Sequence, residues 1–334
     1  YDWKRLAEDE SGDLDARVLL NGMLAKDRLL DLFENFTLFD HSRSGGVRKV
    51  VARNHQFMGV NRAVASVEKQ RELQKEFPPE ERIVWKEHRS ETGETMRLPE
   101  RAHPDLGRLG VFWHTQGSGK SYSMLFFTEK VRRKVEGDFS FVLMTDRTDL
   151  DDQIYKTFAG CGAAKENAPR VSSGKAMREV LAGNHRYVFS LIHKFNQPVD
   201  PEQPYSTRDD IIVISDEAHR TQSGKLARNM RLALPNAGFL GFTGTPLFKR
   251  DEETRRIFGS YVSRYDFQRS VDDGATVKLM YENRGDKLGL ARADLNDRMA
   301  QKIETADLTP EEEMRLEQLL GQDYEVITAD RRLE

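Results

Sequence analysis

The sequence predicts an α/β fold in which a parallel β-sheet is flanked by helices. Short apolar runs recur at 109–113, 140–145, 187–191, 211–215 and 238–242, with helical segments between them. Continuous apolar runs of this kind are typical of strands buried on both faces of a parallel sheet, joined by crossover helices. A glycine-rich loop follows the first run, and polar motifs follow the last two. Ligands of such sheets bind at the carboxyl ends of the strands, where these motifs lie.

The glycine-rich loop joins the run 109–113 to a helix that we expect to extend to about Val135. Strand, glycine loop and helix is the context that a P-loop requires, because its backbone N–H groups and the helix N-terminus surround phosphate oxygens. Lys120 is predicted to reach the β- and γ-phosphates, and the Ser121 hydroxyl to bind Mg²⁺. The predicted nucleotide-binding residues of this loop are Thr115, Gln116, Gly117, Ser118, Gly119, Lys120 and Ser121. The alternative is a glycine- and serine-rich turn with a chance lysine.

An acidic motif follows the run 211–215 directly. We predict that Asp216 holds Mg²⁺ and that Glu217 orients and activates the attacking water, since phosphoryl transfer needs mainly positioning and charge neutralisation from the protein. With Lys120, these two carboxylates form the predicted catalytic set. His219 is predicted to sense the γ-phosphate or to couple to the next motif. The alternative is an acidic loop at a strand end.

A second polar motif, Thr-Gly-Thr-Pro at 243–246, follows the run 238–242. The hydroxyls of Thr243 and Thr245 stand close to the acidic motif if both strands lie in one sheet. They are therefore predicted to link nucleotide state to movement between domains. Taken alone, the segment is equally typical of an ordinary turn.

The composition excludes several classes of protein. The chain has 334 residues, 32% of them charged, and a net charge of −3, so any nucleic-acid track must be local. Its one cysteine, Cys161, excludes a disulfide framework and a four-cysteine zinc site. The sequence has no apolar run long enough for a membrane span and no signal-peptide pattern, which predicts a cytoplasmic protein without membrane contact.

The order of the motifs resembles that of superfamily 2 helicases and translocases. The residues within the motifs resemble those of the motor (R) subunit of type I restriction endonucleases. His114 begins the P-loop where the general pattern has glycine, and histidine is usual there in that family. The segment 146–153 resembles motif Ia, Asp-Glu-Ala-His-Arg at 216–220 the DEAH box, and 241–246 motif III. The resemblance spans about residues 14–285, and 68–108 fit it least and are expected to be a family-variable insertion.

The resemblance implies a RecA-like fold and ATP as the nucleotide. Residues 51–57 resemble the adenine-reading segment of the family, in which Gln56 would meet the edges of adenine, because an amide can both donate and accept hydrogen bonds. The alternative for Gln56 is a surface amide on a helix. Candidate DNA contacts are Arg147, Thr148 and Lys194, whose groups suit phosphates, which position a protein without reading sequence. Their alternative is a solvated loop end.

The expected organisation has three parts. Residues 1–40 form a helical linker, 41–265 the first RecA-like motor domain, and 266–334 the truncated start of a second. Nothing in 266–334 resembles the motif that carries the arginine finger, so we expect the chain to bind ATP·Mg²⁺ but to hydrolyse it poorly. The acidic-x-Lys pattern of a nuclease site is also not found with its acidic partner, and that domain is expected before residue 1.

The leading hypothesis is the ATP-dependent double-stranded DNA translocase portion of a type I restriction R subunit. By resemblance, its parent subunit couples ATP hydrolysis to translocation and endonucleolytic cleavage, with methyltransferase (M) and specificity (S) subunits as partners. One alternative is another superfamily 2 motor, such as an RNA helicase or a remodelling enzyme. Another is a nucleotide-binding scaffold module without turnover. ATP turnover stimulated by duplex DNA but not RNA would favour the first, and no turnover would favour the last.

Overall fold

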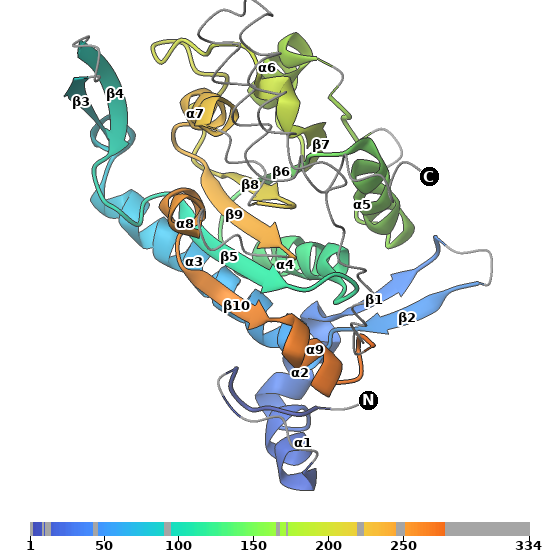
Figure 1. Ribbon diagram of the computed structural model, residues 1–334. Coiled ribbons are helices and arrows are strands. Elements are labelled where there is room, and N and C mark those ends of the chain that lie inside the picture. The colour runs from blue at the N-terminus through green and yellow to red at the C-terminus, as the bar shows by residue number, and fades with distance from the viewer. Residues whose placement is uncertain are drawn as a thin grey trace, which may run out of the picture. The chain divides into compact units, whose positions relative to one another are not determined.

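A six-stranded parallel sheet forms the centre of the molecule (Figure 1). The computed structural model describes residues 3–8, 10, 15–42, 46–89, 95–164, 168–171, 173–218, 224–244 and 251–277. The strand order is β10-β5-β9-β8-β6-β7, and every neighbouring pair is parallel. The strands are β5 (Arg108–His114), β6 (Ser140–Thr145), β7 (Tyr187–Leu191), β8 (Ile211–Ser215), β9 (Gly238–Thr243) and β10 (Tyr261–Tyr265). The predicted α/β fold and its RecA-like sheet are confirmed, and the five strands predicted between residues 109 and 242 are all present, while a strand expected at 281–284 lies outside the described residues.

Helices cover both faces of this sheet and enclose two separate apolar cores. The first core joins the sheet to α3, α4 and α5 through Phe57, Phe126 and Phe158, and the second joins it to α6, α7 and α8. The helices are α3 (Asn54–Glu76), α4 (Lys120–Lys134), α5 (Thr148–Gly160), α6 (Gly174–Ala182), α7 (Gly224–Ala233) and α8 (Asp251–Phe258). Strands buried on both faces explain why their sequences read as unbroken apolar runs.

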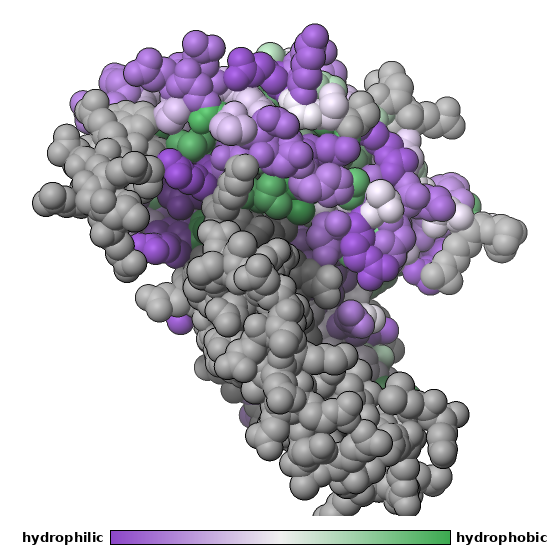
Figure 2. Space-filling view, turned by 45° about the horizontal axis from the view of Figure 1, so that its top comes forward, coloured by the Kyte–Doolittle hydropathy of each residue, from purple (hydrophilic) through white to green (hydrophobic). Residues whose placement is uncertain are grey.

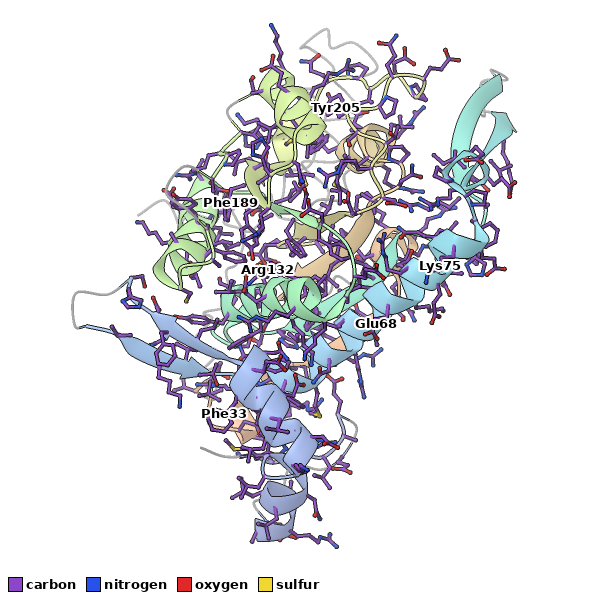
Figure 3. The ribbon with its side chains drawn as sticks, turned by 180° about the vertical axis from the view of Figure 1, so that it is seen from behind. Phe33, Glu68, Lys75, Arg132, Phe189 and Tyr205 are labelled. Atoms are coloured by element: carbon purple, nitrogen blue, oxygen red, sulfur yellow. The ribbon has the colours of Figure 1, made fainter. Side chains whose placement is uncertain are left out.

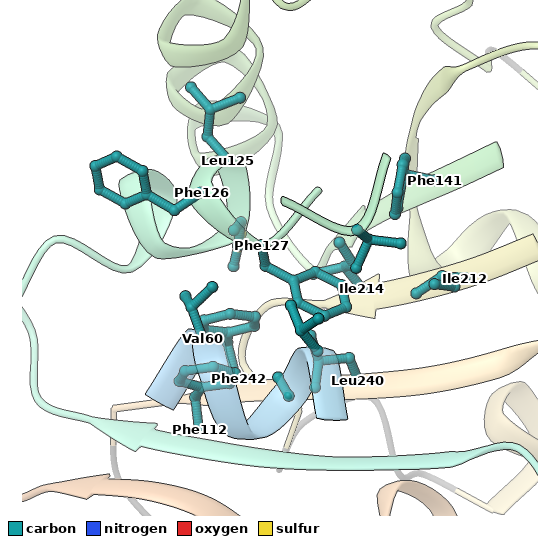
Figure 4. Close-up of a cluster of buried hydrophobic side chains, with 14 of the residues drawn as sticks. Val60, Phe112, Leu125, Phe126, Phe127, Phe141, Ile212, Ile214, Leu240 and Phe242 are labelled. Carbon is teal, nitrogen blue, oxygen red and sulfur yellow. The ribbon is translucent and has the colours of Figure 1, made fainter. Parts of the chain in front are cut away.

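Aromatic side chains hold the strands that carry the P-loop and the threonine motif (Figure 4). The rings of Phe112 on β5 and Phe242 on β9 stack with centroids 4.4 Å apart and planes at 4°. Phe126 and Phe127 of α4 are fully buried against this side of the sheet. Burial of one such ring stabilises the fold by about 1.5–3 kcal/mol, so the ends of β5 and β9 are firmly placed.

The N-terminal residues pack onto the same compact unit, which comprises residues 1–277. Trp3 is 1% exposed, and its ring meets that of Phe57 edge-on at 5.3 Å. A Cβ on Gly22 would come within 2.2 Å of the Trp3 indole nitrogen, so only glycine leaves room there. The other elements here are α1 (Ala16–Gly22), α2 (Lys26–Asn35), β1 (Thr37–Asp40) and β2 (Arg48–Val51), the last two forming an antiparallel hairpin. The domain boundaries at 40 and 265 stay a prediction, and residues from 278 on lie outside the described part.

Several elements were not predicted, among them the hairpin of β1 and β2, whose first strand lies in the segment expected to be helical. The expected insertion begins inside α3, whose outer side carries the exposed Glu68 and Lys75 (Figure 3). It continues as the antiparallel hairpin of β3 (Ile83–Arg89) and β4 (Thr95–Arg101). Another unpredicted element is the edge strand β10, which the short helix α9 (Phe267–Asp272) follows.

The described surface is mainly polar. Figure 2 shows hydrophilic side chains over most of the described part of one face, with hydrophobic side chains in the hollows between them. Within the described residues, no helix is long and apolar enough to cross a membrane. Cys161 is partly buried, and burial raises the pKa of its thiol to about 11, which makes it a poor nucleophile at neutral pH.

Candidate nucleotide site

The P-loop residues lie between β5 and α4, as predicted. Gly117 and Gly119 take left-handed backbone angles, with φ of +79° and +87°. These angles turn the chain tightly into the first residue of α4, Lys120. The Ser118 hydroxyl closes the turn by donating to the Thr115 carbonyl at 2.7 Å. Strand, left-handed glycines and helix N-terminus together form a backbone cradle suited to phosphate.

Lys120 and Ser121 occupy the first turn of α4 at the carboxyl end of the sheet. The Lys120 ammonium donates to the His114 carbonyl at 3.4 Å, back across the mouth of the loop. A Cβ on Gly244, in the threonine motif, would lie 3.4 Å from the Lys120 nitrogen. The two motifs therefore face each other across the ends of β5 and β9.

The acidic motif continues β8 at the same edge. Asp216 is 7% exposed, and its backbone N–H donates to the Met144 carbonyl of β6 at 2.8 Å. Burial raises the pKa of Asp216 to about 6, with Lys120 acting to lower it and Glu217 and Asp146 to raise it. Lys120 and Asp216 thus feel each other's charge, as a phosphate-binding cation and a metal-binding carboxylate of one site should.

Glu217 has the one left-handed backbone among the non-glycine residues that the structure describes, with a φ of 48°. The next residue, Ala218, returns to the sheet by donating its N–H to the Phe242 carbonyl at 2.8 Å. A glutamate in this conformation is held by its surroundings at a cost of about 1–3 kcal/mol, and such residues cluster at functional sites.

The structure brings some of the predicted coupling residues to this edge. Thr243 ends β9 and is 1% exposed. His219 and Thr245 lie outside the described residues. The proximity of the threonine motif to the P-loop is therefore seen at Thr243 and Gly244, and its coupling role stays a prediction.

Gln56 is buried against the P-loop, so the alternative of a surface amide is wrong. It is 4% exposed, and its Nε2 donates to the Gly119 carbonyl at 3.0 Å and to Ser123 Oγ at 3.3 Å. Its Oε1 accepts from the Arg53 N–H at 2.8 Å, which caps the start of α3. The amide thus joins a helix end to the phosphate loop, and its contact with adenine stays a prediction.

A cavity of about 250 Å³ is lined by residues that include Arg53, Asn54 and His55, which directly precede Gln56 in the chain. His55 and Tyr265 form one wall, with rings stacked 3.8 Å apart at 12°. The His55 Nε2 lies 3.1 Å from the Ser118 carbonyl, and the Thr115 N–H donates to the Tyr265 carbonyl at 3.0 Å. Both wall residues therefore touch the P-loop. Pockets for whole drug-sized ligands span about 300–1,000 Å³, so this cavity suits a single ring system.

His114 has a structural role that accounts for its departure from the general P-loop pattern. Its ring is fully buried, and Nε2 lies 2.7 Å from Ser263 Oγ. The Ser263 hydroxyl donates to Glu8 Oε1 at 2.6 Å, so it must accept from His114 Nε2–H. Burial, and then the charges of His55 and Lys120, hold the pKa of His114 well below its usual value. A neutral imidazole thus anchors the start of the loop to the edge strand.

The candidate DNA residues lie along the same edge of the sheet, beyond β8. Arg147 and Thr148 follow β6, and Lys194 follows β7. The Arg147 guanidinium forms an ion pair with Asp149 at 2.6 Å, and both side chains are 60% exposed. The candidate nucleotide residues thus follow β5, β8 and β9. The candidate DNA residues follow β6 and β7 at the same edge of the sheet. The DNA role stays a prediction.

The donor set suits Mg²⁺. Asp216 Oδ1 is a buried oxygen without a hydrogen-bond partner among the described residues, and the Ser121 hydroxyl lies in the facing helix turn. No cluster of three or more acidic, histidine or cysteine side chains that could hold a metal occurs in the described part. Mg²⁺ is usually bound by one or two protein oxygens together with substrate phosphates, so this sparse set is the expected one.

Sequence reasoning missed the partners of the loop. His55 could have been found from the sequence, because it directly precedes Gln56. One turn of helix holds both side chains against the P-loop. Tyr265, Ser263 and Glu8 could not have been found, since β10 was not recognised and Glu8 lies 255 residues from Ser263.

A family model described as SWI2/SNF2 ATPase matches residues 55–314. The chain is 37% identical over 334 aligned residues to the type I restriction enzyme HindI endonuclease subunit of Haemophilus influenzae, covering 94% of this chain and 29% of that subunit. It is 32% identical to the putative type I restriction enzyme MjaIXP endonuclease subunit of Methanocaldococcus jannaschii, covering 92% and 27%. The chain thus spans less than a third of the length of these curated relatives.

Among solved structures, the ATP-dependent type ISP restriction-modification enzyme LlaBIII bound to DNA is similar with a TM-score of 0.40 and 15% identity. That match covers 71% of this chain and 16% of the other.

Proposed function

Because the chain belongs to the SWI2/SNF2 ATPase family, we propose that it is the first motor domain of an ATP-dependent double-stranded DNA translocase, within the R subunit of a type I restriction enzyme. The observation that carries the proposal is that Lys120, after β5, and Asp216 and Glu217, after β8, lie at the same edge of the sheet, with only β9 between the two strands. ATP use follows from the family. Cleavage by the parent subunit is supported by the names of the relatives, whereas translocation and the M and S partners rest on the resemblance of the motifs to that family.

Each residue of the site has a distinct task in this proposal. The backbone turn at Gly117 and Gly119 presents N–H groups to phosphate oxygens, and Lys120 neutralises their charge. Ser121 and Asp216 would hold Mg²⁺, which would help to neutralise the charge of the phosphates. Glu217 orients the attacking water and takes its proton. The base enters the cavity between Arg53 and Tyr265, and Gln56 would have to turn from the P-loop to reach it.

The DNA contact is assigned to the residues after β6 and β7. The N-terminus of α5 offers backbone N–H groups at Thr148, and Arg147 and Lys194 add positive charge, which together suit a phosphate backbone. Because β8 lies between these strands and the P-loop strand, a shift at the acidic motif is transmitted directly to its neighbour β6.

The test is ATP turnover with duplex DNA, RNA or no nucleic acid, on the 334-residue chain and on the whole protein that carries it. We expect turnover stimulated by duplex DNA in the whole protein and abolished there by Lys120→Ala, with only weak turnover in the 334-residue chain. Lys134→Ala is the matched control, because this lysine lies at the other end of the same helix and pairs with Glu34. Turnover that ignores DNA, or that survives in Lys120→Ala, would sink the proposal, and stimulation by RNA alone would favour an RNA helicase.

A further inference from the structure

Four arginines from four different elements surround the first residues of β9. Arg101 ends β4, Arg108 begins β5, and Arg231 and Arg256 lie in the last turns of α7 and α8. Figure 1 shows α7 and α8 on either side of the start of β9. This is the amino-terminal edge of the parallel sheet, opposite the P-loop.

Contacts of individual side chains place this arginine cluster on one surface. The Arg101 guanidinium lies over the Phe239 ring at 5.5 Å and donates to the Ala237 carbonyl at 3.1 Å. Arg108 is the register partner of Phe239 in the sheet. A Cβ on Gly259, directly after α8, would lie 3.2 Å from the Arg108 Cβ. Both arginines therefore border the start of β9, and α8 packs beside them.

Among the described residues, the arginine cluster has no acidic side chain in direct ion-pair contact, although the charges of Asp105 and Glu100 act on Arg108 and Arg231. Arg82 pairs with Asp209 at 2.9 Å, and Arg208 with Asp210 at 2.8 Å. Within the described part of the chain, the side chains of Arg108, Arg231 and Arg256 form no ion pair, and Arg101 donates only to a carbonyl. Arg108 and Arg231 are partly exposed and Arg256 is exposed, so a ligand can reach these three side chains, while Arg101 packs beneath them.

The charges of the cluster act on one another. Burial, and then the charges of Arg231, Arg108 and Arg82, lower the pKa of Arg101 to about 9. Burial, and then Arg108 and Arg256, likewise lower the pKa of Arg231. The chain as a whole has more acidic than basic residues, 55 against 52, so this positive charge is local. Unpaired like charges destabilise the free protein, and a bound anion would offset that repulsion.

We propose that the arginine cluster is a phosphate-binding site for the backbone of a DNA duplex, separate from the nucleotide site and from the residues after β6 and β7. The planar guanidinium matches phosphate with two parallel hydrogen bonds. A protein partner would need an apolar anchor. None of the large hydrophobic residues exposed in the described part lies on β5, β9, α7 or α8. The choice of a duplex as ligand rests on the proposed function.

The test measures binding of a short labelled DNA duplex by fluorescence anisotropy over rising salt concentration. The variants are Arg256→Gln and the double variant Arg231→Gln/Arg256→Gln. Arg186→Gln is the control, since this exposed arginine lies before β7 at the same edge of the sheet. Each lost phosphate contact should reduce the slope of log affinity against log salt by about 0.9, so the double variant should lose about 2. A double variant whose slope equals that of the control overturns the proposal.

Competition distinguishes the sources of negative charge. Inorganic tripolyphosphate should displace the duplex from the wild type and bind the double variant more weakly. Tripolyphosphate binding lost in the variant while duplex binding is unchanged would overturn the duplex assignment in favour of a free polyphosphate. Loss of binding to a polyglutamate peptide alone would overturn it in favour of an acidic protein segment.

Two further measurements keep the result separate from folding and from the proposed function. Arg256 is exposed, so Arg256→Gln alone should melt with the wild type and carry the test if the double variant unfolds. Lys120→Ala should lose nucleotide turnover but keep the salt slope of duplex binding. Failure of DNA-stimulated turnover with an intact slope difference would refute the motor and leave the arginine cluster standing.

Discussion

Glu217 combines a left-handed backbone with the position from which an attacking water would be activated. A side chain that removes a proton in the transition state contributes about 10²–10⁴-fold to the rate, while it adds little to ground-state binding. We therefore predict that Glu217→Gln keeps ATP affinity within a few-fold and lowers turnover by about 100-fold or more. Calorimetric titration with ATP·Mg²⁺ and a phosphate-release assay check the two halves. Equal losses of affinity and turnover would mean that Glu217 acts in binding instead.

The two left-handed glycines of the P-loop differ in what surrounds them. A Cβ on Gly119 would lie 2.8 Å from Gln56 Nε2, whereas a Cβ on Gly117 would meet nothing within 4 Å. Gly117→Ala should therefore cost only the backbone strain, about 1–2 kcal/mol of unfolding free energy. Gly119→Ala should cost more and weaken ATP binding, because Gln56 must move. Urea unfolding of both variants measures the difference, and equal losses would contradict the role given to Gln56.

His55 predicts a pH dependence of stability. Burial lowers its pKa from 6.5 to about 4, so the unfolded chain takes up a proton first as the pH falls. His55 thus contributes full stability above pH 6.5 and loses it progressively towards pH 4, by about 2 kcal/mol at pH 5. The raised pKa of Asp216 acts in the opposite direction below pH 6, so the wild type alone does not isolate the effect.

The variant His55→Gln removes the titration of the imidazole together with its stacking on Tyr265, and the loss of stacking does not depend on pH. The difference in unfolding free energy between wild type and variant should shrink as the pH is lowered from 7.5 to 5, measured by urea unfolding at each pH. A difference that stays constant would show that His55 is not held neutral.

At the scale of elements, the N-terminal segment 3–8 is joined to the edge strand by a buried hydrogen-bond chain. Ser263 links Glu8 to His114, so Ser263→Ala leaves a buried imidazole N–H and a carboxylate each without one partner. We predict a loss of about 1–3 kcal/mol in unfolding free energy, measured by urea denaturation. Ser66→Ala is the control, because its hydroxyl bonds only to the Arg62 carbonyl on the exposed side of α3. It should change stability by no more than about 0.5 kcal/mol. Equal effects would refute the chain.

The elements that could be predicted from the sequence are those whose burial produces a recognisable pattern of residues along the chain. Strands buried on both faces, such as β6 and β8, appear as unbroken apolar runs. In β10, two polar residues interrupt the apolar run. Ser263 accepts a hydrogen bond from His114, and Arg264 lies at the edge of the sheet. The hairpin of β3 and β4 is rich in charged residues and has only a short apolar run at its start, and the segment was interpreted as an insertion.

At the scale of the whole molecule, the predicted motifs meet because parallel strands end at one edge, which topology alone determines. The P-loop, Asp216 and Thr243 were therefore predictable as neighbours. The cavity between Arg53 and Tyr265 was not, because it depends on contacts between α3 and an edge strand about 200 residues later in the chain. The arginine cluster escaped prediction for the same reason, since its members are spread from 101 to 256.

The contact of Glu8 with β10 also affects whether molecules of the protein can associate in solution. Its carboxylate accepts the outward backbone N–H of Arg264 on β10, and the Arg269 guanidinium donates to the Arg264 carbonyl at 2.7 Å. An open sheet edge is a template on which a strand of another molecule can add. Both backbone groups of Arg264 are already occupied by side chains, so self-association through this edge is blocked at its centre.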